Sequence, residues 1–131
     1  MNTETLHETS GKILKGVVQM MQLEEIRRIT LSLPGTEEVE HWGKPSFRIN
    51  NKIFTVVQDD FKTITIKTTK EERDMYTTMS PEIFKIPDSF SNLNYMHINL
   101  ELAKNDEVID LIRNAWGKVA PKKLSRVYFG S

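Results

Sequence analysis

Leu33-Pro34-Gly35-Thr36-Glu37-Glu38 is the stretch at which the chain changes from helix to sheet. Before it, Leu23, Ile26 and Ile29 recur at three- and four-residue spacing, which predicts an amphipathic helix from about Met21 to Ser32. Pro34 cannot continue that helix, and Gly35 permits a turn without a steric penalty. The residues that follow alternate between apolar and polar, which is typical of strands.

Five short strands are predicted beyond that turn. Asn50-Asn51 favours a tight hairpin because asparagine tolerates positive φ. The segment 52–58 is apolar on both faces in its middle, which indicates a central strand. The predicted strands cover Glu37–Trp42, Ser46–Asn50, Lys52–Gln58, Thr63–Thr68 and Tyr95–Leu100, with a turn over Gly43-Lys44-Pro45.

Two further helices are predicted in the second half of the chain. Thr69 and Glu72 have the spacing of a capping box, which opens a helix to about Thr78 with Met75 and Met79 directed inward. Ser80-Pro81-Glu82 resembles a second, shorter helix start. The last helix is expected to begin at an Asn105 cap, to pack Trp116 inward, and to end before Pro121. The tail from Lys122 is basic and then aromatic, and no helix is assigned to it.

This order of elements predicts an α+β fold: a two-layer sandwich with an antiparallel sheet and helices packed on one sheet face. The other sheet face is then open. A chain of 131 residues fits one domain, which we assign to residues 21–131. Residues 1–20 are either a packed additional helix or a loosely attached extension, and we predict an appended helix with a frayed beginning.

Composition excludes several classes of site. The chain has no cysteine, so disulfides, thiol catalysis and thiolate metal sites are ruled out. No apolar run approaches the roughly 18 residues of a membrane span, and residues 1–4 lack the features of a signal peptide, so we expect a cytoplasmic protein. No serine-nucleophile, phosphate-loop or dinucleotide motif is present. We therefore predict a non-enzymatic protein without cofactor or metal.

Charge is unevenly placed although the net charge is zero. Residues 44–70 carry six bases against two acids, and residues 111–131 carry five bases and no acid. A basic cluster in the second segment could contact phosphates or could simply be a solvated helix end; it contains Lys118, Lys122, Lys123 and Arg126.

The predicted open face supplies another candidate site. Cations, hydrogen-bonding groups and an aromatic ring on a sheet can bind nucleic acid or a small anion, although any solvated sheet face shows similar residues. By strand alternation this face displays Arg48, Thr63, Thr65, Lys67, Tyr95, His97 and Asn99.

Two other groups of residues have simpler interpretations. The carboxylates of Glu37, Glu38 and Glu40 lie near His41, but their spacing matches no metal-ligand signature. Trp42 and Trp116 are interpreted as packing anchors, with Trp42 closing an edge of the sandwich.

Four segments, in this order and at these spacings, resemble the MmcQ/YjbR family of small bacterial proteins. They are Leu33-Pro34-Gly35-Thr36-Glu37-Glu38, Trp42-Gly43-Lys44-Pro45-Ser46-Phe47-Arg48, Lys52-Ile53-Phe54 and Val119-Ala120-Pro121-Lys122-Lys123-Leu124. The resemblance implies a CyaY-like fold, shared with frataxin-type proteins, and DNA binding through two β-hairpin wings. It implies no catalytic residues.

Our leading hypothesis is a domain that binds DNA or another polyanion through its basic hairpin and C-terminal segments. The candidate phosphate contacts are Arg48, Lys52, Lys67, Lys122, Lys123 and Arg126, and the open-face candidates are Tyr95, His97 and Asn99. Two alternatives stay open: a frataxin-like metal or small-ligand binder that uses Glu37, Glu38 and Glu40, and a protein-interaction module with residues 1–20 as its docking helix.

Overall fold

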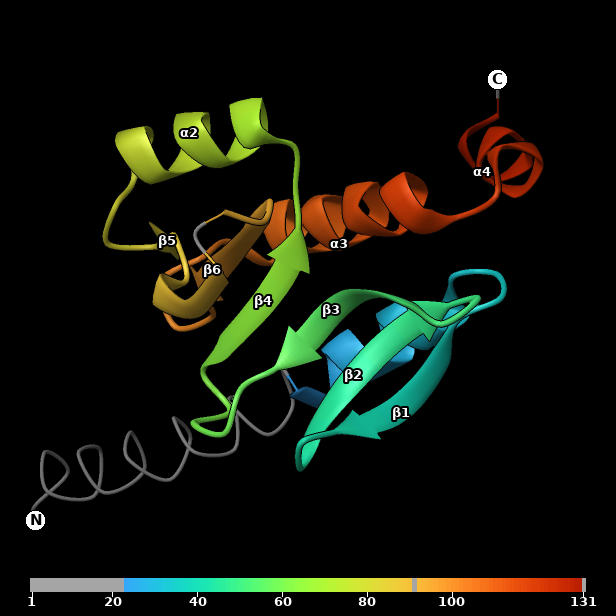
Figure 1. The fold of residues 1–131 in the computed structure, drawn as a ribbon, viewed down its shortest axis with the longest axis horizontal. Helices are drawn as coiled ribbons and strands as arrows, with labels where there is room; N and C mark the ends of the chain where they lie inside the picture. The colour runs from blue at the N-terminus through green and yellow to red at the C-terminus, as the bar shows by residue number, and fades with distance from the viewer. Residues whose placement is uncertain (1–22, 91, 131) are drawn as a thin grey trace, which may run out of the picture.

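The computed structural model describes residues 23–90 and 92–130 (Figure 1). The predicted N-terminal extension over residues 1–20 lies outside the described residues. Residues 23–32 are helical. The remaining elements are β1 (Glu37–His41), β2 (Lys44–Ile49), β3 (Lys52–Val57), β4 (Thr63–Lys67), α2 (Lys70–Met79), β5 (Phe84–Lys85), a short 3-10 helix (Asp88–Phe90), β6 (Tyr95–Asn99), α3 (Asn105–Val119) and α4 (Lys122–Phe129).

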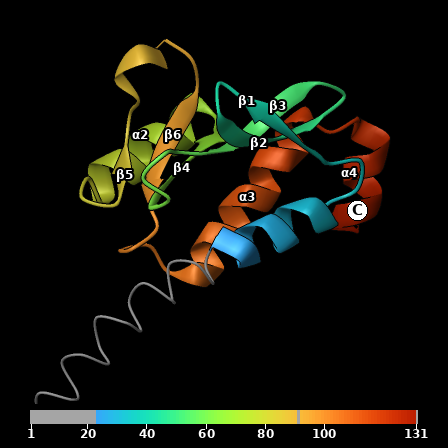
Figure 2. The ribbon, with the colours of Figure 1, turned by 90° about the horizontal axis from the view of Figure 1, so that it is seen from below.

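The strands form one six-stranded sheet in the order β1-β2-β3-β4-β6-β5. Every pairing in it is antiparallel. The helix over residues 23–32 and α3 lie together on one side of the sheet (Figure 2). The predicted α+β class, with helices packed on one sheet face, is therefore confirmed. No helix among the described residues is both long and apolar enough to cross a membrane.

The core lies between this helical layer and the sheet. Ile26 of the first helical segment, Leu33 directly after it, Ile64 of β4 and Ile112 of α3 are all buried in one cluster. Trp116 is fully buried there and donates its indole N–H to the carbonyl oxygen of Pro34 at 3.0 Å. The predicted role of Trp116 as a packing anchor is confirmed, and it joins the last long helix directly to the helix-to-sheet turn.

Gly35 is required at that turn for two reasons. Its φ is +75°, and a Cβ atom would lie 2.8 Å from Cδ1 of Ile49. A side chain would therefore be strained by the backbone conformation and would also collide with the core. Asn50 and Asn51 have φ of 48° and 64°, which confirms the predicted tight hairpin between β2 and β3.

β3 contains a bulge that decides which residues face the core. Phe47 pairs with Thr55, but Arg48 pairs with Ile53, so Phe54 is the additional residue. Phe54 and Thr55 are both buried, whereas Ile53 and Val56 face away from the helices. The predicted strand therefore shows apolar residues on both faces, and it is central as expected.

α2 packs differently from the prediction. The capping box of Thr69 and Glu72 is present, but Met75 and Met79 are exposed rather than directed inward. The inner face of the helix instead carries Arg73, which is buried, and Tyr76, whose ring packs 4.8 Å from that of Phe84. This aromatic contact fixes the rotation of α2 and leaves both methionines at the surface.

Two other local predictions were wrong, and one helix was not predicted. Residues 81–83 form turns leading into β5 rather than a second helix. The N-cap of α3 is Lys104, and Asn105 is already its first helical residue. The tail forms a helix, α4, because the ring of Tyr128 packs on that of Trp116 with centroids 4.9 Å apart. A helix of eight residues is marginal alone, so this tertiary contact stabilises it.

Candidate functional site

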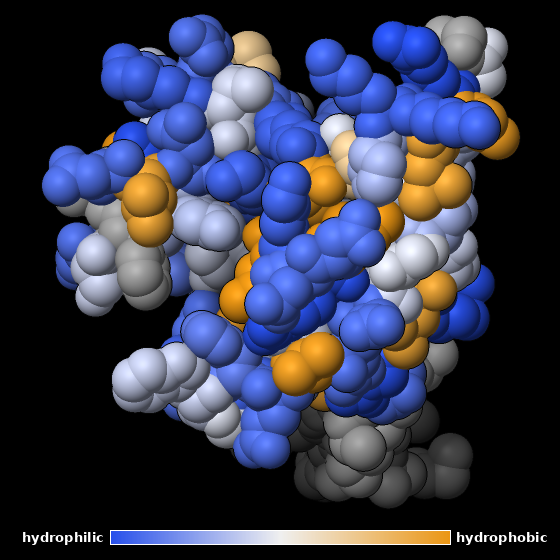
Figure 3. Space-filling model, turned by 45° about the vertical axis from the view of Figure 1, so that its right-hand side comes forward, coloured by the Kyte–Doolittle hydropathy of each residue, from blue (hydrophilic) through white to orange (hydrophobic). Residues whose placement is uncertain are grey.

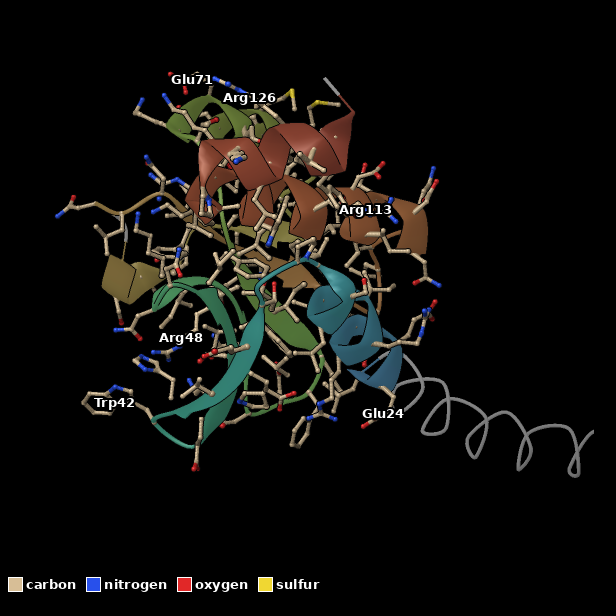
Figure 4. All side chains as sticks on the ribbon, turned by 90° about the vertical axis from the view of Figure 1, so that its right-hand side faces the viewer. Glu24, Trp42, Arg48, Glu71, Arg113 and Arg126 are labelled. Atoms are coloured by element: carbon tan, nitrogen blue, oxygen red, sulfur yellow. The ribbon has the colours of Figure 1, made fainter. Side chains whose placement is uncertain are left out.

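A groove of about 470 Å³ lies on the sheet face that the helices leave open. Figure 4 shows Trp42 and Arg48 on this side of the molecule, opposite Glu24 and Arg113, which belong to the helical side. Apolar surface is exposed between hydrophilic side chains in Figure 3. The groove is lined by His41, Trp42, Lys44, Ile53, Val56, Gln58, Thr65, Leu93, Tyr95 and His97.

The apolar floor of the groove follows from the bulge in β3. Ile53 and Val56 lie on the face that carries the groove, and both are only partly buried. In a sheet covered on one face, a strand with apolar residues on both faces must leave some of them without a helix above. This pattern in residues 53–57 is the sequence signal for the groove, although by itself it indicates only a central strand.

Trp42 stands at the rim of the groove, and its predicted packing role was wrong. Its side chain is 90% exposed. His41 and Lys44 are the last paired residues of β1 and β2, and between them Trp42 and Gly43 have φ of 55° and 79°. This is a two-residue hairpin turn with positive φ at both central positions. The turn carries the tryptophan beyond the paired strands, where its ring is exposed.

A chain of hydrogen bonds crosses the groove. The ammonium of Lys44 donates to Oε1 of Gln58 at 2.8 Å, and Nε2 of Gln58 donates to Oγ1 of Thr65 at 2.7 Å. The same hydroxyl lies 2.6 Å from Nδ1 of His97. Lysine can only donate, which orients the amide of Gln58 so that its Nε2 donates to Thr65. In the last bond either Oγ1 of Thr65 or Nδ1 of His97 is the donor, according to the tautomer of the imidazole.

Burial supports the neutral form of His97. Desolvation lowers the pKa of His97 below its usual value, and Lys44 adds to that effect. The carboxylates of Asp60 and Asp88 act in the opposite direction but do not overcome burial. Burial therefore favours the neutral imidazole at neutral pH.

Some of the predicted open-face residues do meet in the groove. Thr65, Tyr95 and His97 all line it. Lys67 is paired in register with Tyr95, and its ammonium lies 5.2 Å from the centre of the tyrosine ring. This geometry is a cation–π contact at the edge of the groove.

Thr63 and Asn99 are held by local bonds instead. Oγ1 of Thr63 donates to Asp60 at 2.9 Å, and Oδ1 of Asn99 accepts from the backbone N–H of Glu101 at 2.9 Å. Neither residue lines the groove.

Arg48 lies on β2 and is only partly exposed. Its guanidinium donates to Oγ of Ser46 at 2.8 Å and to Oδ1 of Asn51 at 2.9 Å, which fixes its position beside the hairpin. Its cross-strand neighbour in β1 is the acidic residue Glu37. Lys52 is exposed at the start of β3 and does not line the groove.

The C-terminal cations lie on a separate helix. Lys122, Lys123 and Arg126 are exposed on α4, and none of them lines the groove. Figure 4 shows Arg126 well apart from Trp42. Lys118 forms an ion pair of 2.8 Å with Glu72 of the α2 capping box. The candidate cations are therefore divided between the open face and α4.

The acidic residues of β1 do not form a metal site among the described residues. Glu38 forms an ion pair of 2.9 Å with Arg27 of the first helix. Over residues 23–90 and 92–130, no group of three or more histidine, aspartate or glutamate side chains is placed to hold a metal ion. These carboxylates lie on an edge strand instead, where four of five residues are exposed.

The fold and groove together define a small α+β protein with a ligand-sized hollow on the uncovered face of an antiparallel sheet. The chain belongs to the YjbR family, whose model matches residues 31–118. Its fold is similar to that of the Deinococcus radiodurans protein DR2400, which carries the domain DUF419. The TM-score is 0.69 at 14% sequence identity, over 82% of this chain and 86% of that one. The comparison with curated proteins gave no match.

Proposed function

We propose that this protein is a non-enzymatic nucleic-acid-binding protein that holds single-stranded DNA on its open sheet face. The observation that carries the proposal is the exposed ring of Trp42 at the rim of a groove that Tyr95 also lines. Successive unpaired bases can stack on such rings, and each stacked base contributes about 1–3 kcal/mol.

Cations on the same face supply the contacts to phosphate. Lys44 lines the groove, Lys67 lies over the ring of Tyr95, and Arg48 is fixed beside the β2–β3 hairpin. Two or three neutralised phosphates on a single strand give a salt slope of about −1.4 to −2. The net charge of zero is consistent with weak binding and a shallow salt dependence rather than the steep dependence of a basic DNA-binding domain.

Lack of catalysis is part of the proposal. The polar side chains of the groove are joined in one chain of hydrogen bonds from Lys44 to His97. The ten lining residues include no carboxylate, and the Thr65 hydroxyl is engaged on both sides. This arrangement favours binding over acid–base or nucleophilic chemistry.

Titration with a short oligothymidine at low and moderate salt tests the proposal. Trp42 fluorescence should be quenched on binding, and Trp42→Ala should weaken binding about 5- to 150-fold, the equivalent of one stacked base. The double variant Lys122→Ala/Lys123→Ala is the matched control, because it removes two cations from α4 and should leave binding within about twofold.

Three results would contradict the proposal. The first is no binding of oligothymidine even at low salt. The second is a loss of binding in the α4 variant alone, which would assign the site to the C-terminal segment. The third is tighter binding to duplex DNA of the same length, which would favour recognition by the hairpins instead of stacking.

A further inference from the structure

Lys44 and Gln58 both present N–H donors to the groove beyond those that their mutual hydrogen bonds use, which nucleic-acid binding does not require. We propose that the groove is also a binding site for a small, planar, largely apolar molecule that bears one carboxylate. The carboxylate would bind Lys44 and the neighbouring donors, and the ring system would lie over Ile53 and Val56, against Trp42 and Tyr95.

The hydrogen bonds in the groove show which polar groups could bind an occupant. Oε1 of Gln58 accepts from Lys44, so the amide presents N–H groups, of which one is used by Thr65. Oγ1 of Thr65 is engaged with both Gln58 and Nδ1 of His97. Lys44 has further N–H groups beyond the one it gives to Gln58. Lys44 and the amide of Gln58 therefore present N–H donors to the groove, and an occupant that supplies acceptors can bind them.

The charged side chains that line the groove favour an anionic occupant with a single charge. Lys44 is the lone lysine or arginine among the ten lining residues, and no aspartate or glutamate stands among them. One ammonium matches one carboxylate, whereas a phosphate dianion would be left with an unmatched charge. A cationic occupant would meet Lys44 with no carboxylate of the lining to offset it.

The apolar lining and the volume of the groove indicate the shape of the occupant. Ile53, Val56 and Leu93 contribute aliphatic surface, and the aromatic rings of Trp42 and Tyr95 contribute flat surface. A volume of about 470 Å³ is in the range of sites for small organic ligands, which are mainly apolar with a few oriented polar groups. Flat walls and an aliphatic floor favour a planar ring system over a sugar or a peptide.

The inference can be tested with 2-naphthoate as the probe. Titration of the intact protein, followed by calorimetry and by the indole N–H resonance of Trp42, should show saturable binding at one site. The neutral isostere 2-naphthamide should bind at least about tenfold more weakly, because the charge-assisted hydrogen bond from Lys44 is lost. The cationic analogue 2-naphthylmethylammonium should not bind.

Two lysine variants give the matched comparison. Lys44→Met keeps the apolar stem and removes the charge, and it should weaken 2-naphthoate binding about tenfold or more. Lys85→Met changes a lysine that is paired in register with His97 but lies outside the lining, and it should leave affinity within about threefold. Comparison of the three probes on the unchanged protein keeps the test decisive if a variant fails to fold.

Equal binding of the three probes, no binding of 2-naphthoate, or an unchanged affinity in Lys44→Met would each overturn the inference. The outcome is separable from that of the proposed function. Oligothymidine binding without 2-naphthoate binding would sink the inference alone, and 2-naphthoate binding without oligothymidine binding would uphold it while refuting the nucleic-acid proposal. Where both bind, they should compete, since both use Trp42.

Discussion

Replacement of Trp42 by asparagine is expected to make the protein more stable and to weaken ligand binding. Trp42 occupies a turn position with φ of 55°, and its ring is 90% exposed. A bulky side chain in the left-handed region is uncommon, and such strain is often found at binding sites. The position therefore combines a conformational cost to the fold with a ring placed where a ligand can reach it.

The expected change in the free energy of unfolding has two contributions: the strain relieved in the backbone and the burial lost with the ring. An ordinary L-residue in the left-handed conformation costs about 1–2 kcal/mol, and asparagine is among the residues that adopt it readily. Because the ring is 90% exposed, the burial lost with it is worth only about 0.5 kcal/mol. We expect Trp42→Asn to raise the free energy of unfolding by about 1 kcal/mol, which corresponds to a rise in Tm of about 3 °C for a chain of this size.

Urea unfolding followed by far-UV circular dichroism measures this change. The other two-residue hairpin turn offers a reciprocal control: Asn50 is exposed and has φ of 48°. Asn50→Trp should lower the free energy of unfolding by a similar amount, about 1 kcal/mol. Destabilisation in Trp42→Asn would refute the reasoning, because it would mean that the ring contributes packing that its exposure does not show.

Three further predictions concern single sites. Burial lowers the pKa of His97, so the unfolded chain binds more protons than the native state below about pH 6.5. The free energy of unfolding should therefore fall as the pH drops through that value, and it should fall less in His97→Gln. Identical pH profiles of urea unfolding for the two proteins would contradict this. Gly35→Ala should lower the free energy of unfolding by about 2–3 kcal/mol, because its Cβ would lie 2.8 Å from Ile49 and its φ is +75°. Gly43→Ala should lower it by only about 1 kcal/mol, because the φ is +79° but no atom lies within 4 Å of the added Cβ. Equal losses in thermal unfolding would show that the collision at Gly35 is relieved. Thr55→Val should raise the free energy of unfolding, measured by urea unfolding, by about 1 kcal/mol, because Oγ1 of Thr55 is buried without a hydrogen-bond partner among the described residues. A destabilised variant would reveal a partner for that hydroxyl.

Much of the fold could be predicted because its determinants are local. The stripe of Ile26 and Ile29, the capping box of Thr69 with Glu72, and the Asn50-Asn51 hairpin each depend on residues within a few positions of one another. Their outcome does not require knowledge of the rest of the chain.

The groove and α4 could not be predicted because they depend on distant contacts. Residues 53–57 show which positions are apolar, but the bulge at Phe54 decides which of them face the helices. The exposure of Trp42 follows from the positive φ of Trp42 and Gly43, which place the ring beyond the paired strands. α4 exists because its aromatic residues reach Trp116 of the preceding helix, and eight residues alone carry too weak a periodic signal.

The acidic edge strand has a consequence for how copies of this protein meet. β1 is an outer strand, and Glu37, Glu38 and Glu40 occupy three of its five positions. An unpaired strand edge invites another chain to extend the sheet, and rows of like charge are a common defence against such aggregation. Antiparallel addition of a second β1 would place carboxylates of the two copies side by side, which repel each other at neutral pH. The edge thereby counteracts growth of the sheet into polymers, and the uncovered face beside it stays accessible to a ligand.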